Sequence, residues 1–251
     1  MPFVRSAEEI AAIEAALSRP RYFDAARLSV EFETDPEILA SLLPPPLRPG
    51  PTPLVAVTIG RWRSNCLGRF DGALVHLSVV HEGLAGTYAL VMYMSGEAAI
   101  GFGREAVGEP KRYGRGWLFA GEEGFSAHLE RRGTRLIELD MRPRESSGPG
   151  QSTNLTYNVK SRTAASGHGL EEDAILTRTT FSNSLRVLRE GPASIRLRST
   201  AVDPLGELPV VSVVRGVYAE YDAEARCESV ATIPAAEYAP FHYGRVELEP
   251  G

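Results

Sequence analysis

Residues 27–34, RLSVEFET, place apolar and polar side chains at alternate positions along the chain. Leu28, Val30 and Phe32 occupy one set of positions, and charged or hydroxyl residues stand between them. Successive side chains of a β-strand point to opposite faces, so this stretch predicts a strand with one buried face and one polar face. The fold is therefore expected to be built on strands.

The same alternation continues along most of the chain. Apolar or β-branched runs broken by glycine occur at 54–62, 73–82, 86–94, 98–103, 193–200 and 210–221. Residues 126–142 predict a hairpin that turns near Arg132, Gly133 and Thr134, and residues 143–153, PRESSGPGQST, predict a polar loop. With so many strands and no change of composition that marks a linker, we expect one domain over residues 1–251.

Two short helices are predicted on the outside of this domain. Ser6 and Glu9 have the spacing of a capping box, which predicts an N-terminal helix within residues 1–19. Thr34 or Asp35 is expected to cap a second helix that ends before the prolines at 44–46. The predicted fold is mainly β (α+β): an antiparallel barrel or strongly bent sheet with a few peripheral helices.

Composition excludes several classes of protein. The net charge of -5 and a pI near 5.7 offer no basic field for nucleic acid. No run approaches the roughly 20 apolar residues that cross a bilayer, and the acidic N-terminus is unlike a signal peptide, so we expect a cytoplasmic protein. Cys66 and Cys227 are too isolated for a disulfide framework or a zinc site, and the histidines lack metal-ligand spacing.

Residues 103–114, GREAVGEPKRYG, contain one of only two lysines among the 27 basic residues of the chain. An amine can lose its proton and act as a nucleophile, whereas a guanidinium cannot, so Lys111 is a candidate nucleophile. Burial and the neighbouring cation of Arg112 are expected to favour the neutral amine. The alternative is an ordinary solvated lysine.

The longer segment 92–114, MYMSGEAAIGFGREAVGEPKRYG, resembles the region around the Schiff-base lysine of the acetoacetate decarboxylase family. Lys111 matches that lysine, and Arg112 replaces a second lysine that follows it in the family. Weaker similarity extends over residues 20–235. The resemblance implies a closed, antiparallel β-barrel-like fold, a lysine inside an apolar cavity, no metal or organic cofactor, and assembly into homo-oligomers.

This chain departs from the family where the decarboxylase places two glutamates and an arginine near the lysine. Gly72 stands at one glutamate position, and Val57 or Thr58 stands at the other. Asp71 lies beside the first position and would enter the pocket only through a one-residue register shift or a bulge. The family's arginine falls at Ala25, with Arg27 two residues further on.

The sequence therefore gives six candidate site residues. Lys111, Glu105, Glu109 and His76 are predicted to act in catalysis, and Arg27 and Arg112 to bind the substrate. Glu109 stands where the decarboxylase has an aromatic residue, and His76 shares a strand face with Gly72. Lys160, on the opposite strand face from Tyr157, is interpreted as structural.

The predicted function is that of a lyase that forms an imine between Lys111 and a small keto acid. The missing glutamates favour a diverged aldolase or dehydratase, or another carbon–carbon lyase. Two alternatives remain: decarboxylation of acetoacetate or another β-keto acid, and a non-catalytic binding protein on the same fold.

Overall fold

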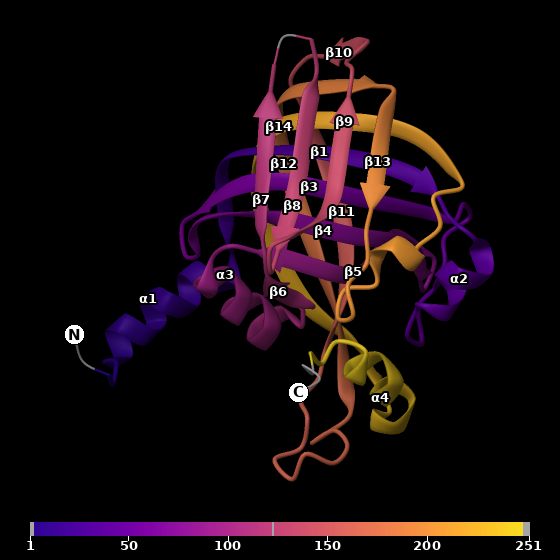
Figure 1. Cartoon of the computed structure of the whole chain (residues 1–251). Coiled ribbons are helices and arrows are strands. Elements are labelled where there is room, and N and C mark those ends of the chain that lie inside the picture. The colour runs from indigo at the N-terminus through magenta and orange to yellow at the C-terminus, as the bar shows by residue number, and fades with distance from the viewer. Residues whose placement is uncertain (1–2, 122, 248–251) are drawn as a thin grey trace.

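The computed structural model describes residues 3–121 and 123–247 (Figure 1). Its elements are predominantly strands, as the period of two predicts. The helical elements described are α1 (Ala7–Ser18), α2 (Pro36–Ser41), α3 (Glu97–Phe102), α4 (Ala235–Tyr243), the π-helical turn η1 (Gly103–Val107) and the 3-10 turn η2 (Leu205–Glu207). None of these helices is long and apolar enough to cross a lipid bilayer.

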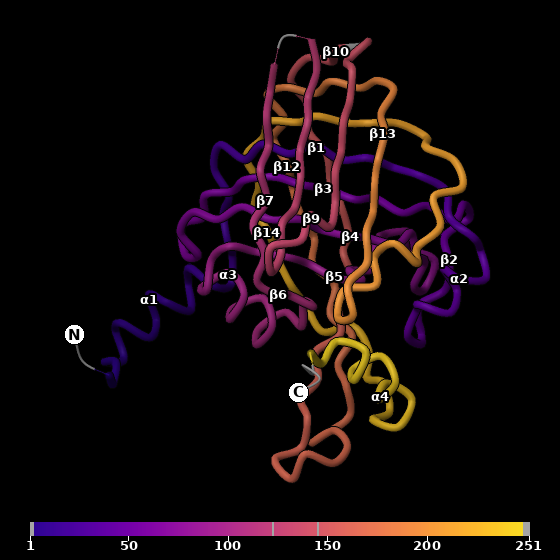
Figure 2. Tube along the Cα trace, in the orientation of Figure 1, coloured from indigo at the N-terminus to yellow at the C-terminus, as the bar shows by residue number. Residues whose placement is uncertain are grey.

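Seven strands close into a barrel, because β4 pairs with both β3 and β5. Around the ring they are β4 (Gly68–His81), β3 (Leu54–Ser64), β1 (Arg21–Glu33), β14 (Ser212–Ile233), β12 (Ala174–Gly191), β11 (Gly150–Lys160) and β5 (Leu84–Met94). Three short strands extend this sheet, namely β2 (Arg48–Pro49), β6 (Lys111–Tyr113) and β10 (Glu145–Ser147). The trace in Figure 2 follows the C-terminal segment through the ring as β14 and into α4.

A second sheet lies across one side of the barrel (Figure 1). It contains β13 (Ala193–Leu197), β9 (Thr134–Met141), β8 (Phe125–Arg131) and β7 (Arg115–Ala120), in that order. Leu28, Val30 and Phe32 on the outer face of β1 are fully buried in one cluster with residues of this sheet such as Leu129 and Ile137. The main apolar core therefore lies between the barrel and the second sheet.

The opposite face of the barrel wall points inward and mixes small, aromatic and polar residues. Ala25, Ala219 and Tyr221 belong to a separate buried cluster on this side. Ser29 hydrogen-bonds Thr58 across β1 and β3, with an Oγ to Oγ1 distance of 2.7 Å. The alternation seen in residues 27–34 therefore separates the outer core from the inside of the barrel.

Several predicted elements are confirmed. The hairpin between β8 and β9 turns at Arg132 and Gly133, both with positive φ. Ser6 and Glu9 form the reciprocal capping box of α1, which has no buried residue and extends away from the barrel (Figure 1). Of the two candidate caps for the second helix, Asp35 is the one that accepts hydrogen bonds, from the backbone of Glu37 and Ile38.

Two local predictions were wrong. Residues 98–103, expected as a strand, lie in α3 and at the start of η1, because their short apolar run also suits a helix and Gly96 accepts the helical hydrogen bond of Ile100. The polar segment 143–153 contains β10 and the start of β11 in addition to a turn. Its backbone pairs with β12, which its polar composition did not reveal.

The barrel is also not wholly antiparallel. β5 pairs in parallel with β6 and with β11. Parallel neighbours need a long crossover, and here α3 with η1 supplies the one between β5 and β6. This crossover delivers the lysine segment to the barrel.

Candidate active site

The lysine segment turns sharply before it joins the sheet. Gly108 ends η1 in the left-handed region with φ of 81°, where glycine avoids the steric cost of a side chain. The backbone N–H of Glu109 then donates to Gly103, and that of Met92 donates to Pro110. These bonds fix the start of β6, where Lys111 pairs with Met92.

The Lys111 amine is buried beside a carboxylate. The side chain of Lys111 is 6% exposed, and its Nζ lies 2.6 Å from Oε2 of Glu109, which is 12% exposed. The Nζ also donates to the carbonyl of Ala99 at 3.1 Å. The amine therefore sits in low-dielectric surroundings with a proton acceptor in direct contact.

Gly103 makes this contact sterically feasible. A Cβ on Gly103 would lie 2.7 Å from Nζ of Lys111 and would overlap Oε2 of Glu109. Any larger residue would push the ion pair apart or displace the π-helical turn. The first residue of the GRE motif is therefore needed for close packing over the amine.

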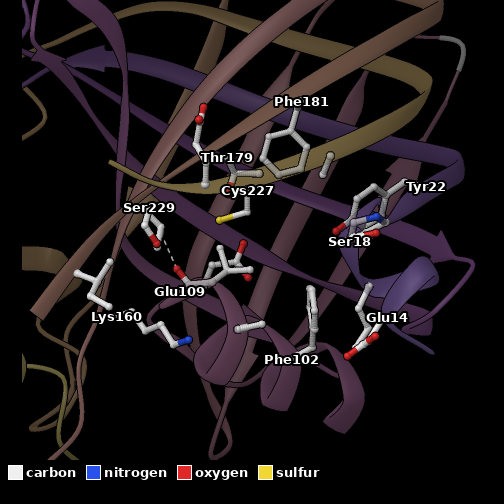
Figure 3. A pocket seen from close by; sticks show the side chains of 18 residues that line it. Glu14, Ser18, Tyr22, Phe102, Glu109, Lys160, Thr179, Phe181, Cys227 and Ser229 are labelled. Atoms are coloured by element: carbon white, nitrogen blue, oxygen red, sulfur yellow. Dashed lines mark hydrogen bonds between the residues drawn. The ribbon is translucent and has the colours of Figure 1, made fainter. Parts of the chain in front are cut away.

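A cavity of about 450 Å³ opens next to this pair (Figure 3). Glu109 lines it together with residues from α1, β1, β11, β12, β14 and the turn η1. Figure 3 shows Glu109 and Lys160 on one side of the space and Tyr22 and Phe181 on the other. Burial raises the pKa of the Tyr22 hydroxyl, and the Glu109 carboxylate raises it further. The cavity thus combines apolar walls with a few polar groups, as small-molecule sites usually do.

Arg27 and His76 lie on the inward face of the barrel wall. The Arg27 guanidinium carbon is 5.5 Å from the centre of the Tyr221 ring. Burial lowers the pKa of His76 to about 4, and the charge of Arg27 adds to this effect. His76 is consequently neutral at pH 7.

Arg112 and Glu105 are placed away from the amine. Arg112 follows Lys111 on β6 and points to the other side, where its Nη1 lies 2.9 Å from Oδ1 of Asp203. Burial disfavours the charged form of Asp203, but hydrogen bonds from Arg131, Tyr93 and Arg112 hold its pKa below the usual range. Glu105 is exposed on η1 and has no hydrogen bond or ion pair among the described residues.

The structure also shows what surrounds the positions where the resemblance places the two glutamates of the decarboxylase. A Cβ on Gly72 would overlap the carbonyl oxygen of Tyr93, so no side chain fits there without a shift of the strands. Asp71 accepts a hydrogen bond from the backbone of Gly116 at 2.8 Å and is not among the residues lining the cavity.

At the second glutamate position, Val57 packs in the outer core, and Thr58 hydrogen-bonds Ser29. Glu109 is the carboxylate that contacts the amine.

Two residues that were not predicted as site residues also line the cavity. Lys160 was interpreted as structural, but its side chain borders the same space as Glu109. Cys227 also lines the cavity, and burial raises the pKa of its thiol. The scarcity of lysine in the chain was the available signal for Lys160. Within residues 3–121 and 123–247, no three His, Cys, Asp or Glu side chains are grouped to hold a metal ion.

The sequence profile described as Acetoacetate decarboxylase (ADC) matches residues 1–232. Acetoacetate decarboxylase of Streptomyces nogalater is 28% identical over 205 residues, which cover 79% of this chain and 83% of that protein. Its counterpart in Ralstonia nicotianae is 27% identical over 198 residues, covering 74% and 77%.

Solved structures show the same fold. Acetoacetate decarboxylase from Legionella pneumophila superposes with a TM-score of 0.76 at 21% identity, covering 85% of this chain and 87% of that one. The enduracididine biosynthesis enzyme MppR, in complex with pyruvate, gives a TM-score of 0.70 at 17% identity, covering 84% and 90%. With a barrel of matching fold, a family profile that spans most of the sequence and a buried lysine in the GRE segment, the chain belongs to the acetoacetate decarboxylase family.

Proposed function

We propose that the protein is a lyase that forms an imine between Lys111 and the carbonyl carbon of a small keto acid. The observation that carries the proposal is the buried contact of 2.6 Å between the Lys111 amine and Glu109 at the cavity. A primary amine beside a proton acceptor, shielded from water, is the arrangement that nucleophilic attack on a carbonyl requires.

The imine forms with a balanced set of proton transfers. Glu109 first takes one proton from the Lys111 ammonium, and the resulting neutral amine attacks the ketone carbon. A second proton passes from that nitrogen to the developing alkoxide, which gives the hydroxyl group of the carbinolamine. Glu109 then returns a proton to the hydroxyl group, which leaves as water while the nitrogen lone pair forms the C=N bond. The protonated imine withdraws electrons from the neighbouring carbon, so no other cofactor is needed for this step.

The leading reaction is an aldol or dehydration reaction of a 2-keto acid. Loss of a proton from the carbon next to the imine gives an enamine, which attacks an aldehyde carbonyl and forms a carbon–carbon bond. Two features support this choice. Gly72 leaves no room for a side chain at the position where the resemblance places a decarboxylase glutamate, and Glu109 contacts the amine from the position where the resemblance places an aromatic residue. MppR, which shares the fold, has been solved with the condensation product of pyruvate and imidazole 4-carboxaldehyde.

Decarboxylation of a β-keto acid is the second candidate. In that case the bond to the carboxylate carbon breaks, carbon dioxide leaves, and the electron pair moves into the imine to give an enamine that is then protonated. The curated relatives in Streptomyces nogalater and Ralstonia nicotianae, both named acetoacetate decarboxylase, favour this reaction.

Product analysis distinguishes the two reactions. Purified protein is incubated either with acetoacetate, with carbon dioxide measured, or with pyruvate and a small aldehyde, with condensation products measured by mass spectrometry. We expect condensation with pyruvate to exceed release of carbon dioxide from acetoacetate. The reverse order would support the decarboxylase, and no turnover in either assay would contradict both.

A further inference from the structure

The amine and the carboxylate of the candidate active site are carried by two separately held pieces of chain. Lys111 lies on β6, where it pairs with Met92 of β5. Glu109 lies in the turn between η1 and β6, and its Oε2 is 2.6 Å from Nζ of Lys111. A displacement of the turn would move Glu109 while the strand kept Lys111 in place. Whatever fixes the turn therefore also fixes the distance between the proton acceptor and the amine.

Side chains hold the two carbonyl groups of the turn that precede Glu109. The Val107 carbonyl, at the end of η1, accepts from the Thr177 hydroxyl at 2.6 Å. The next carbonyl, that of Gly108, accepts from Nη1 of Arg245 at 3.4 Å. The last carbonyls of a helix have no partner within the helix, so such an end needs outside donors. Here the donors come from β12 and from the segment that follows α4.

Thr177 makes the shorter of these two bonds. It is 2% exposed and lines the cavity together with Glu109. Its hydroxyl is also 3.3 Å from the carbonyl of Asn158, but a hydroxyl has a single proton, and the shorter distance assigns that proton to Val107. Valine would keep the shape of this side chain and lack the donor. The hydroxyl therefore has a use that packing alone does not explain.

Arg245 is a second and weaker hold on the same turn. Besides Gly108 it donates to the Val159 carbonyl at 3.1 Å and to the Tyr88 hydroxyl at 2.7 Å, so its guanidinium is shared among three acceptors. It also lies beyond residue 232, where the match to the family profile ends. Thr177 is consequently the tighter of the two side-chain holds.

We infer that Thr177 is a positioning residue of the active site, whose hydroxyl fixes the turn that places Glu109 against the Lys111 amine. This inference rests on the proposed function, in which that contact moves the protons of imine formation. Among the described residues, Thr177 has no hydrogen bond to either of the two side chains, so it acts through the backbone of the turn. Its effect on the rate should therefore disappear when residue 109 can no longer take a proton.

The rate of imine formation tests this role. It is followed by borohydride trapping on Lys111 at saturating pyruvate or acetoacetate. Thr177→Val should slow the reaction about tenfold, because even a small displacement of a positioned group slows a reaction. Thr177→Ser keeps the hydroxyl and should stay within about twofold of the wild type. In a Glu109→Gln background, Thr177→Val should cost less than about twofold, since the two changes then remove the same contribution.

Hydrogen exchange tests the hold on the turn without any ketone. The backbone N–H of Glu109 donates to Gly103, so its exchange reports opening of the turn. Thr177→Val should speed this exchange about tenfold, as the loss of one hydrogen bond does. Thr34→Val is the matched control, because Thr34 is also 2% exposed but its Oγ1 has no hydrogen-bond partner among the described residues. It should leave the exchange of the Glu109 amide unchanged.

Unchanged exchange of the Glu109 amide in Thr177→Val would overturn the inference. A loss of rate that persists in full in the Glu109→Gln background would also overturn it, because Thr177 would then act independently of Glu109. The same holds if Thr177→Ser is as slow as Thr177→Val. If the wild type forms no imine with either acid, the proposed function is contradicted, and the exchange rates alone decide whether Thr177 holds the turn.

Discussion

The two faces of the barrel wall are built for different tasks, and β1 shows both. Leu28, Val30 and Phe32 point outward and are fully buried against the second sheet. Arg27 points inward and has a buried nitrogen without a partner. The outer face follows the rule that cores are apolar and closely packed, whereas the inner face keeps polar groups that stability alone would not retain.

This contrast locates function in the fold. Groups that lower the stability of the free protein persist where they are used in binding or chemistry. Glu109, which contacts the buried Lys111 amine, lines the cavity. Substitutions on the outer face should therefore lower stability without changing ligand binding, whereas substitutions on the inner face should change ligand binding or catalysis.

Phe32→Ala should give the largest effect on stability. Removing a fully buried aromatic ring from the outer core leaves a cavity and should lower the free energy of unfolding by about 3–5 kcal/mol. Urea denaturation measures this change, while the activity of the remaining folded protein in the product assays should be unaltered. Val211→Ala, at a residue that is 66% exposed, is the control and should change stability by less than about 0.5 kcal/mol. A small effect of Phe32→Ala would contradict the division of the two faces.

Glu109→Gln should have the next largest effect, on catalysis. The amide keeps the shape of the side chain but cannot accept the proton of the amine, so kcat should fall about 100-fold. Steady-state kinetics with whichever of acetoacetate and pyruvate plus aldehyde reacts faster measures the loss. Glu105→Gln, the same change at an exposed position of the same segment, should leave kcat unchanged. If the two variants behaved alike, Glu109 would not be the group that moves protons.

The smallest expected effect is the pH dependence that His76 adds to stability. Its pKa of about 4 in the folded protein lies below the ordinary value of 6.5, so the unfolded chain binds the proton first. The free energy of unfolding should therefore fall as the pH drops below about 6.5, by about 2 kcal/mol at about pH 5. Unfolding curves of the wild type and of His76→Gln are compared, and this component should be absent from the variant. Parallel pH profiles would show that His76 is not held neutral inside the barrel.

Much of the wall of the barrel was predictable from local pattern. The period of two, the hairpin at Arg132 and the capping box of Ser6 depend on neighbouring residues, and each is observed. The order of strands depends on distant pairings, such as Leu28 with Tyr218, and local pattern does not determine these. The helix at Glu97–Phe102 was missed because its six residues, five of them apolar or small, carry no decisive period.

A site residue was predictable where its residue type is rare in the sequence. It was not predictable where its role depends on which face of a strand it occupies. Lys111 was distinctive because the chain has only two lysines. A polar residue on an inner strand face, such as Thr177, has the same local pattern as one that faces solvent. Arg112 was predicted to bind the substrate, but adjacent residues on β6 point to opposite sides, and its guanidinium pairs with Asp203 away from the Lys111 amine.

The central claim is that the Lys111 amine forms an imine with a keto acid. Borohydride reduction in the presence of pyruvate or acetoacetate, followed by peptide mass spectrometry, tests it directly, with Lys111→Arg and Lys160→Arg as paired variants. A reduced adduct on Lys111 that persists in Lys160→Arg and disappears in Lys111→Arg is the predicted result. An adduct on Lys160 alone, or no adduct with either acid in folded protein, would contradict the claim.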